Sequence, residues 1–289
     1  MVKFFVLSRF IVRFYKSSIV FLYFLVASHN FTMYFQKGFF MINSNTFSNF
    51  NSKYPIYADL HTHSISSGHG SEDTITDMIR CASESGLSLF GISDHGPATS
   101  SSAKPSYFQS LKLADRDRFG IRVLYGAELN IINTAGDVDL DDDTLSTLDY
   151  AIISIHPPIF KPYHDKDLSS AYIRAMDHPK VRFLGHIDDA RFPVDFECLL
   201  EIAKGKHVYP EINNGSLMPD AYRINGQENC RRILSICKKL DLPVLLSSDS
   251  HGKKNIGNMQ YIFPLLEELD FPAHLVLNSD LSALSEIIR

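Results

Sequence analysis

Several patterns that mark common protein classes are missing from this 289-residue sequence. Its four cysteines are scattered, with no C-x-x-C pair and no secretory spacing, so we expect free thiols in a reducing, cytoplasmic compartment. Neither G-x-G-x-x-G nor G-x-x-x-x-G-K-[ST] occurs, which argues against the nucleotide-binding open sheets that carry them. The apolar run Ile19–Ala27 is far too short to span a membrane.

Acidic residues are absent from residues 1–58, which carry six lysines and arginines. The remaining chain therefore holds 22 basic and 33 acidic residues, a net charge of −11. An acidic body without a basic cluster argues against duplex nucleic acid as the main partner. It favours a protein that attracts cations.

The composition also changes abruptly near residue 53, because twelve of the 21 phenylalanines precede it. We expect residues 1–53 to be an N-terminal extension and 54–289 to be the working domain. Basic residues before the apolar run make residues 1–28 similar to an export signal, and the absence of acid also fits a transit peptide. A further alternative is that Met33 or Met41 is the natural start.

Beyond residue 54, short β-rich runs alternate with helical patterns. Seven strands are expected to end near residues 61, 95, 128, 156, 186, 213 and 249, at intervals of 27 to 36 residues. This spacing predicts parallel strands joined by right-handed helical crossovers. We therefore expect an α/β fold, a TIM-like (β/α)7 barrel one strand short of eight, with an open doubly wound sheet as the alternative.

Helices are expected between these strands. Thr74 and Asp77 form a capping-box pattern that opens a helix over 75–84. The acidic stretch 137–143 is expected to be a solvated hairpin or loop. The other helices are expected near residues 107–116, 168–176, 196–203, 228–240, 261–269 and 281–288.

Metal-ligand side chains recur where the predicted strands end. His61 and His63 are one residue apart on a strand, so their side chains emerge on the same face. A single strand-end histidine is most often an ordinary core or rim residue, but six of the seven strands end in such side chains. The candidate ligands are His61, His63, His69, His95, Glu128, His156, His186, Asp249 and His251. The other five histidines are expected to be surface or packing residues: His29, His164, His178, His207 and His274.

Nine ligands exceed what one tetrahedral ion needs, and they could hold three ions if a carboxylate bridges. Imidazole with carboxylate favours zinc, allows manganese or iron, and disfavours calcium and magnesium. Such a cluster lowers the pKa of bound water, and paired ions clamp the oxygens of an in-line displacement. That chemistry suits phosphate esters.

Five short motifs resemble those of the PHP (polymerase and histidinol phosphatase) family, most closely its YcdX-type phosphatases. They are Asp59-Leu60-His61-Thr62-His63, Ser93-Asp94-His95-Gly96-Pro97, Gly126-Ala127-Glu128-Leu129-Asn130, Glu211-Ile212-Asn213-Asn214 and Ser248-Asp249-Ser250-His251. The likeness covers residues 54–289 and none of 1–53. It implies a distorted seven-stranded barrel with three metal ions, usually zinc, at the carboxyl ends of its strands.

The resemblance also implies which residues share each ion. It places one ion with His61, His63, Glu128 and Asp249, a second with Glu128, His156 and His186, and a third with His69, His95 and His251. The chain departs from the family at Ile187, where a proline commonly follows the histidine, and this leaves the shape of the adjoining loop open.

Substrate contacts are expected after the sixth strand and near residue 191. Asn213, Asn214 and Ser216 could face substrate, and the guanidinium groups of Arg191 and Arg223 could hold phosphate oxygens. The alternative is that both arginines are exposed loop residues. No Ser-His-Asp order or activated cysteine is apparent, so we expect attack by a metal-bound hydroxide rather than a covalent intermediate.

The leading hypothesis is a metal-dependent hydrolase that cleaves a small phosphomonoester. A PHP-type nuclease or exonuclease would use the same metals, but polymerase regions and a basic groove are lacking. An amidohydrolase usually places a bridging lysine at the fourth strand, where this chain has His156. A scaffold or metal-storage domain is expected to carry other residue types at some of the ligand positions, and none of the nine is replaced. The sequence selects neither the substrate nor the oligomeric state.

Overall fold

The computed structural model describes residues 53–157, 159–160 and 166–289, together with four short strands within the first 52 residues. Those strands form two antiparallel hairpins, β1 (Phe4–Leu7) with β2 (Phe10–Arg13) and β3 (Phe24–Ala27) with β4 (Asn30–Met33). The chain divides into two units, Met1–Phe47 and Ser48–Arg289. His29 and His164 both lie outside the described residues. The predicted division into 1–53 and 54–289 stays a prediction.

Seven parallel strands form the sheet of the larger unit, in the order β13-β12-β11-β10-β9-β7-β5. The short strand β8 (Asp117–Arg118) adds to β9 in the antiparallel sense. The seven strands are β5 (Ala58–Asp59), β7 (Leu89–Ile92), β9 (Ile121–Asn130), β10 (Tyr150–Ser154), β11 (Val181–Leu184), β12 (Tyr209–Asn213) and β13 (Leu245–Ser247).

The sheet is nearly closed, because β6 (Thr62–His63), just beyond β5, pairs in parallel with β14 (Ser250–His251), just beyond β13. The first and seventh strands thus meet through their continuations. The predicted seven-stranded barrel is confirmed, and the open doubly wound alternative is wrong.

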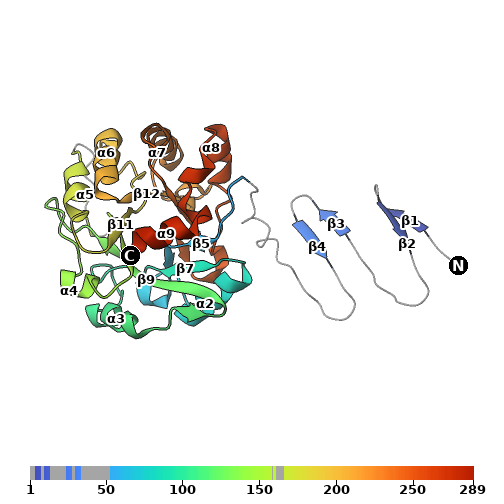
Figure 1. Ribbon diagram of the computed structural model, residues 1–289, viewed down its shortest axis with the longest axis horizontal. Coiled ribbons are helices and arrows are strands. Elements are labelled where there is room, and N and C mark those ends of the chain that lie inside the picture. The colour runs from blue at the N-terminus through green and yellow to red at the C-terminus, as the bar shows by residue number, and fades with distance from the viewer. Residues whose placement is uncertain are drawn as a thin grey trace. The chain divides into compact units, whose positions relative to one another are not determined.

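Helices follow the strands and surround the sheet (Figure 1). The predicted helix over 75–84 is confirmed as α2 (Ile75–Glu84), with both hydrogen bonds of its Thr74–Asp77 capping box. The remaining α-helices are α3 (Pro105–Ser110), α4 (Asp142–Leu145), α5 (Ser169–Ala175), α6 (Phe196–Lys206), α7 (Gly226–Leu240), α8 (Phe263–Glu268) and α9 (Leu281–Ile288). None of the described helices is long and apolar enough to cross a membrane.

One sequence expectation needs correction. The acidic stretch 137–143 is not simply a solvated loop, because α4 begins within it at Asp142 and Asp139 is partly buried. The Asp139 carboxylate accepts hydrogen bonds from the backbone and side chain of Asn130. Composition alone predicts solvation for acidic residues, but these donors compensate for the loss of water.

The barrel interior changes character along its strands. At the amino-terminal end, inward side chains such as Leu60, Leu124, Tyr150 and Phe183 form an apolar core, on which Leu284 of α9 packs. In Figure 1, α9 lies across the view in front of the strands. Successive strand side chains alternate between faces, so the same inward face carries polar groups further along. The polar side chains at the carboxyl ends of the strands therefore lie next to an apolar layer that fills the rest of the barrel interior.

Candidate metal centre

The nine predicted ligands all come together at the carboxyl ends of the barrel strands. Eight of them are buried or partly buried, and His69, which follows the short 3-10 helix Ile65–Ser67, is exposed. Their rings and carboxylates converge from every strand except β12. The prediction that these residues share one site agrees with their positions, and their role as ligands stays a prediction.

Glu128 lies at the centre of this group. Its carboxylate is fully buried, and five histidine nitrogens lie within 3.6 Å of it. These five nitrogens are His95 Nδ1 at 2.6 Å, His186 Nε2 at 2.9 Å, His156 Nε2 at 3.3 Å, His61 Nε2 at 3.4 Å and His63 Nε2 at 3.6 Å. A carboxylate surrounded in this way can bridge two cations.

Four buried polar atoms of the cluster lack a hydrogen-bond partner within the described part of the chain. They are His61 Nε2, His63 Nε2, His95 Nδ1 and Glu128 Oε2. Burial of unpaired polar atoms is costly, and native proteins rarely leave such groups together without a reason. Cations placed among them would satisfy all four, so the residues present fit a metal centre.

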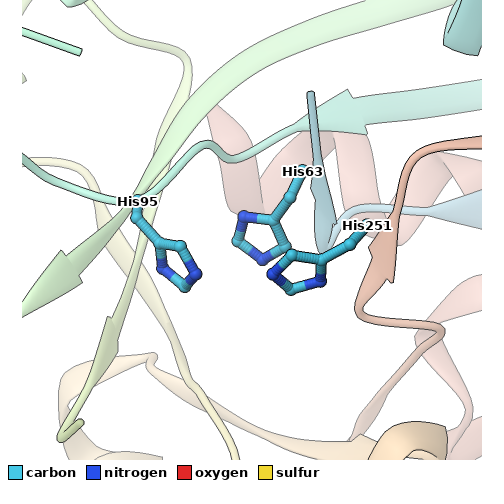
Figure 2. Close-up of side chains that lie close together, drawn as sticks. All are labelled: His63, His95 and His251. Atoms are coloured by element: carbon cyan, nitrogen blue, oxygen red, sulfur yellow. The ribbon is translucent and has the colours of Figure 1, made fainter. Parts of the chain in front are cut away.

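Three groups of ligand atoms lie close enough to hold an ion, each with its atoms within 4.8 Å of one another. They are His63 with His95 and His251, His61 with His63 and Asp249, and His95 with Glu128 and His156. Figure 2 shows the first group, in which the rings of His95 and His251 face that of His63. The groups share His63 and His95, so the predicted division of ligands among three ions stays a prediction.

In two of the imidazoles, the second ring nitrogen faces a hydrogen-bond acceptor that is not itself a candidate ligand atom. The Nδ1 of His61 lies 2.5 Å from Glu211 Oε1, and that of His251 lies 3.1 Å from the carbonyl of Asp249. Neither acceptor can donate, so both Nδ1 atoms carry a proton, and Nε2 is the atom of each ring that can coordinate once it carries none. Outer partners of this kind set the tautomer of metal-binding histidines.

His63 reaches the same state through a serine. The Ser67 hydroxyl donates to Asp94 Oδ1 at 2.7 Å, so it can only accept from His63 Nδ1, 3.0 Å away. Asp94 is itself held by Ser64 and Tyr107. The proton on Nδ1 leaves the Nε2 of His63 pointing into the cluster.

Glu211 is the main supporting residue to which sequence reasoning gave no role. It is fully buried, bonds His61 through Oε1, and accepts from the backbone N–H of His186 through Oε2 at 2.7 Å. Asn213 Nδ2 donates to the same Oε2 atom at 3.2 Å. The available signal was the alternation of β12, because Glu211 and Asn213 share the inward face.

In the metal-free protein, the surroundings shift the pKa values of His61 and His63 in opposite directions. Burial lowers the pKa of His63 well below its usual value, and the nearby His95 and His251 lower it further. Burial also acts to lower the pKa of His61, but Glu211 and the other carboxylates raise it well above its usual value. His63 is therefore the readier ligand, whereas His61 must lose a proton first.

Two of the candidate ligands have a left-handed backbone. His186 has φ of +28° and Asp249 has φ of +53°. Non-glycine residues in this region are uncommon, and they cluster at functional sites, where the surrounding structure holds them. Here the hydrogen bond from His186 N to Glu211 and the ion pair of Asp249 with Arg223 at 2.7 Å hold the two residues in place.

A cavity of about 900 Å³ opens over the cluster. Five candidate ligands line it, together with residues such as Thr99, Met218 and Tyr222. These ligands are His69, His95, His156, Asp249 and His251. This volume suits a small organic ligand.

The four predicted substrate contacts differ in position. Arg191 and Arg223 line the cavity, but Arg191 is paired with Asp189 and Arg223 with Asp249. Among the described residues, Asn213 and Asn214 are not part of that lining. Asn213 Nδ2 also donates to Asp249 at 3.0 Å, and Asn214 Oδ1 accepts from Tyr261 N at 3.0 Å. Contact with substrate stays a prediction for all four residues.

Sequence comparison identifies the family. The profile of the PHP domain matches residues 59–214. A probable phosphatase of Clostridium acetobutylicum is 36% identical over 231 residues, which is 80% of this chain and 93% of that protein. This chain belongs to the PHP domain family.

Other relatives agree with this membership. A second probable phosphatase, from Clostridium novyi, is 35% identical over 222 residues, or 77% of this chain and 90% of that protein. Among solved structures, histidinol phosphate phosphatase from Lactococcus lactis, complexed with zinc, L-histidinol and phosphate, superposes with a TM-score of 0.53. That match has 19% identity and covers 74% of this chain and 94% of the other, so it supports the PHP fold alone.

Proposed function

We propose that this PHP domain protein is a metal-dependent phosphatase that hydrolyses a small phosphomonoester. The observation that carries the proposal is the set of unpartnered, buried imidazole and carboxylate atoms converging on Glu128 beneath an open cavity. Relatives that match four-fifths of the chain bear the name probable phosphatase, which supports the same reaction class.

Zinc is the metal we propose, at three ions per chain, with manganese or iron as alternatives. Imidazole-rich sites suit zinc, and the Lactococcus lactis relative holds zinc. When bound, the ions would lower the pKa of a coordinated water and neutralise phosphate oxygens. The chain would supply His61, His63, His69, His95, Glu128, His156, His186, Asp249 and His251 as ligands.

The protein's own groups have distinct tasks in this proposal. Glu211 and Ser67 hold protons on the outer nitrogens of His61 and His63, so that the inner nitrogen of each ring is the one that would coordinate. Arg223 lies where it can orient Asp249 and also face a phosphate in the cavity. Arg191 lines the same cavity and could meet the phosphate or its leaving group.

A cytoplasmic location is also our proposal. It is supported by four cysteines that are all free, with Cys230 and Cys237 buried on α7 as small core residues. Cell fractionation tests it, and recovery of the protein in a secreted fraction would contradict it.

Purified protein loaded with zinc or manganese tests the reaction. We expect phosphate release from a panel of phosphomonoesters, loss of that activity with a chelator, and its return when metal is added back. Small phosphodiesters and single-stranded DNA serve as comparison substrates. Cleavage of those comparison substrates without monoester hydrolysis would indicate a nuclease and overturn the proposal.

A further inference from the structure

An acidic side chain outside the predicted ligand set is connected to the cluster through one asparagine. Asn130 ends β9, two residues after Glu128, and its Oδ1 lies 2.7 Å from Nδ1 of His156. The other side of the Asn130 amide faces Asp139, whose Oδ2 lies 2.6 Å from Asn130 Nδ2. The three residues form a continuous hydrogen-bonded chain.

The chemistry of Asp139 sets the direction of every bond in this chain. An ionised carboxylate only accepts, so the Asn130 atom that faces it must be the NH2 group. The amide oxygen then faces His156 and requires a proton on its Nδ1. Thr99 also contacts the amide, at 3.1 Å from Nδ2, but a hydroxyl can donate or accept and does not fix its orientation.

The fold holds Asp139 in position by several independent contacts. Ile131 bridges to Val138 across a short hairpin, which brings Asp139 back beside Asn130. The carboxylate also accepts from the backbone N–H of Asn130 and of Ala98, each at 2.9 Å.

The space around the carboxylate is matched to it as well. A Cβ placed on Gly96 would lie 2.3 Å from either oxygen of Asp139. Any side chain at residue 96 would therefore displace the carboxylate. The close approach shows that Asp139 occupies a defined place beside the strand that carries Glu128.

We propose that Asp139 is a positioning residue that, through the Asn130 amide, keeps the proton of His156 on Nδ1 and its Nε2 free to bind metal. The inference rests on the proposed metal site. The Nε2 atom lies 3.3 Å from Glu128 Oε1, and a bare nitrogen facing a carboxylate oxygen is favourable when a cation lies between them. Asp139 thus acts on the metal centre without touching it.

Zinc affinity measured by competition with a fluorescent chelator tests the proposal in the full chain. Asp139→Asn should weaken at least one zinc site by about 10–100-fold, the usual effect of removing an outer partner of a metal-binding histidine. Asn130→Ala should have a similar effect while leaving the two backbone bonds to Asp139 intact. Asp137→Asn is the matched control, because within the described part of the chain Asp137 bonds the side chain of Asn133 and main-chain groups of the same hairpin, and no residue of the cluster.

A second measurement reads the tautomer directly. Nitrogen NMR of the metal-free protein should show that Nδ1 of His156 carries a proton. In both Asp139→Asn and Asn130→Ala, the spectrum should show Nδ1 losing its proton in a substantial fraction of the molecules. This reading does not depend on phosphatase activity or on zinc, so it separates failure of this inference from failure of the proposed function. Unchanged tautomer and unchanged zinc affinity in Asn130→Ala or in a folded Asp139→Asn would overturn the proposal.

The exchange variant Asn130→Asp with Asp139→Asn provides a rescue. It restores an acceptor for His156 and a donor between the two side chains, although the new NH2 group then faces the Ala98 N–H, which donates to the same Asp139 Oδ2 atom in the unaltered protein. Zinc affinity should therefore recover in part, above that of Asp139→Asn alone. If Asp139 only tied two loops together, the two substitutions would add their losses instead. An exchange variant weaker than Asp139→Asn would contradict the positioning role.

Discussion

At the scale of single residues, Glu128 is the side chain on which the proposed centre depends most. Its two oxygens face nitrogens from five histidines, and no other described carboxylate of the site has so many. A charge at this position can offset two cations at once, which a neutral side chain of the same size cannot.

Glu128→Gln tests this role. The amide offers only one oxygen and no negative charge, so we expect loss of about two metal ions and a fall in phosphatase activity of at least about 100-fold. Circular dichroism should still show a folded barrel. Elemental analysis checks the metal content, with exposed Glu72→Gln as the control, and a fully metallated, active Glu128→Gln would place the centre elsewhere.

The proton on His61 leads to a second prediction, on pH. Because nearby carboxylates raise the pKa of His61 well above its usual value, the metal-free protein carries this proton at neutral pH. Zinc must displace it, so zinc binding should release about one proton and apparent affinity should rise as the pH rises through neutrality.

Calorimetry of zinc binding in buffers of different ionisation enthalpy measures this release. Glu211→Gln removes the carboxylate nearest to His61 and should reduce the number of protons released. Zinc affinity that does not change with pH around neutrality would contradict the prediction.

At the scale of elements, local sequence signals were most reliable for helix starts. The Thr74–Asp77 pattern gave the start of α2 correctly, because a capping box depends only on residues three apart. The acidic stretch before α4 was misjudged, because the burial of Asp139 depends on its return to Asn130 across a hairpin.

The cap of α2 provides an element-scale prediction. Thr74 Oγ1 accepts from Asp77 N at 3.2 Å, and Thr74→Ala leaves that N–H without its cap. The free energy of unfolding should fall by about 1 kcal/mol, with no change in metal content. Denaturant titration measures the loss, and Glu84→Ala at the exposed end of the same helix should change stability by less than about 0.5 kcal/mol.

At the scale of the whole molecule, the Asn278 side chain links the two edge strands of the barrel, in addition to the pairing of β6 with β14. β5 and β13 are the two ends of the ladder, and the buried Asn278 side chain lies between them. It donates to the carbonyls of Ala58 and Leu246 at 2.8 and 2.7 Å and accepts from Leu246 N at 2.7 Å. One amide thus connects backbone groups of β5 and β13, which do not pair with each other directly.

Asn278→Ala should therefore destabilise the whole barrel. Three buried backbone groups would lose their partner, and we expect a loss on the order of 3 kcal/mol in the free energy of unfolding. Ser279→Ala, which removes one partly buried hydroxyl bond next to it, is the control and should cost less than about 1 kcal/mol. Equal stability of the two variants would show that the barrel closes without the amide.

The sequence alone determined the barrel and the candidate ligands. Strand alternation, helix caps and the metal-ligand side chains at six of the seven strand ends are all encoded within a few neighbouring residues, and parallel strands bring their carboxyl ends together. The PHP resemblance followed from the same short motifs.

Only the tertiary structure decided which residues support that site. Glu211 meets His61 across 150 positions of sequence, Asn278 meets Ala58 across 220, and Asp139 reaches His156 only through Asn130. A carboxylate or amide has no local pattern that reveals a distant partner. Its role depends on which donor and which charge the closed barrel places beside it, because burial makes each unpaired polar atom costly.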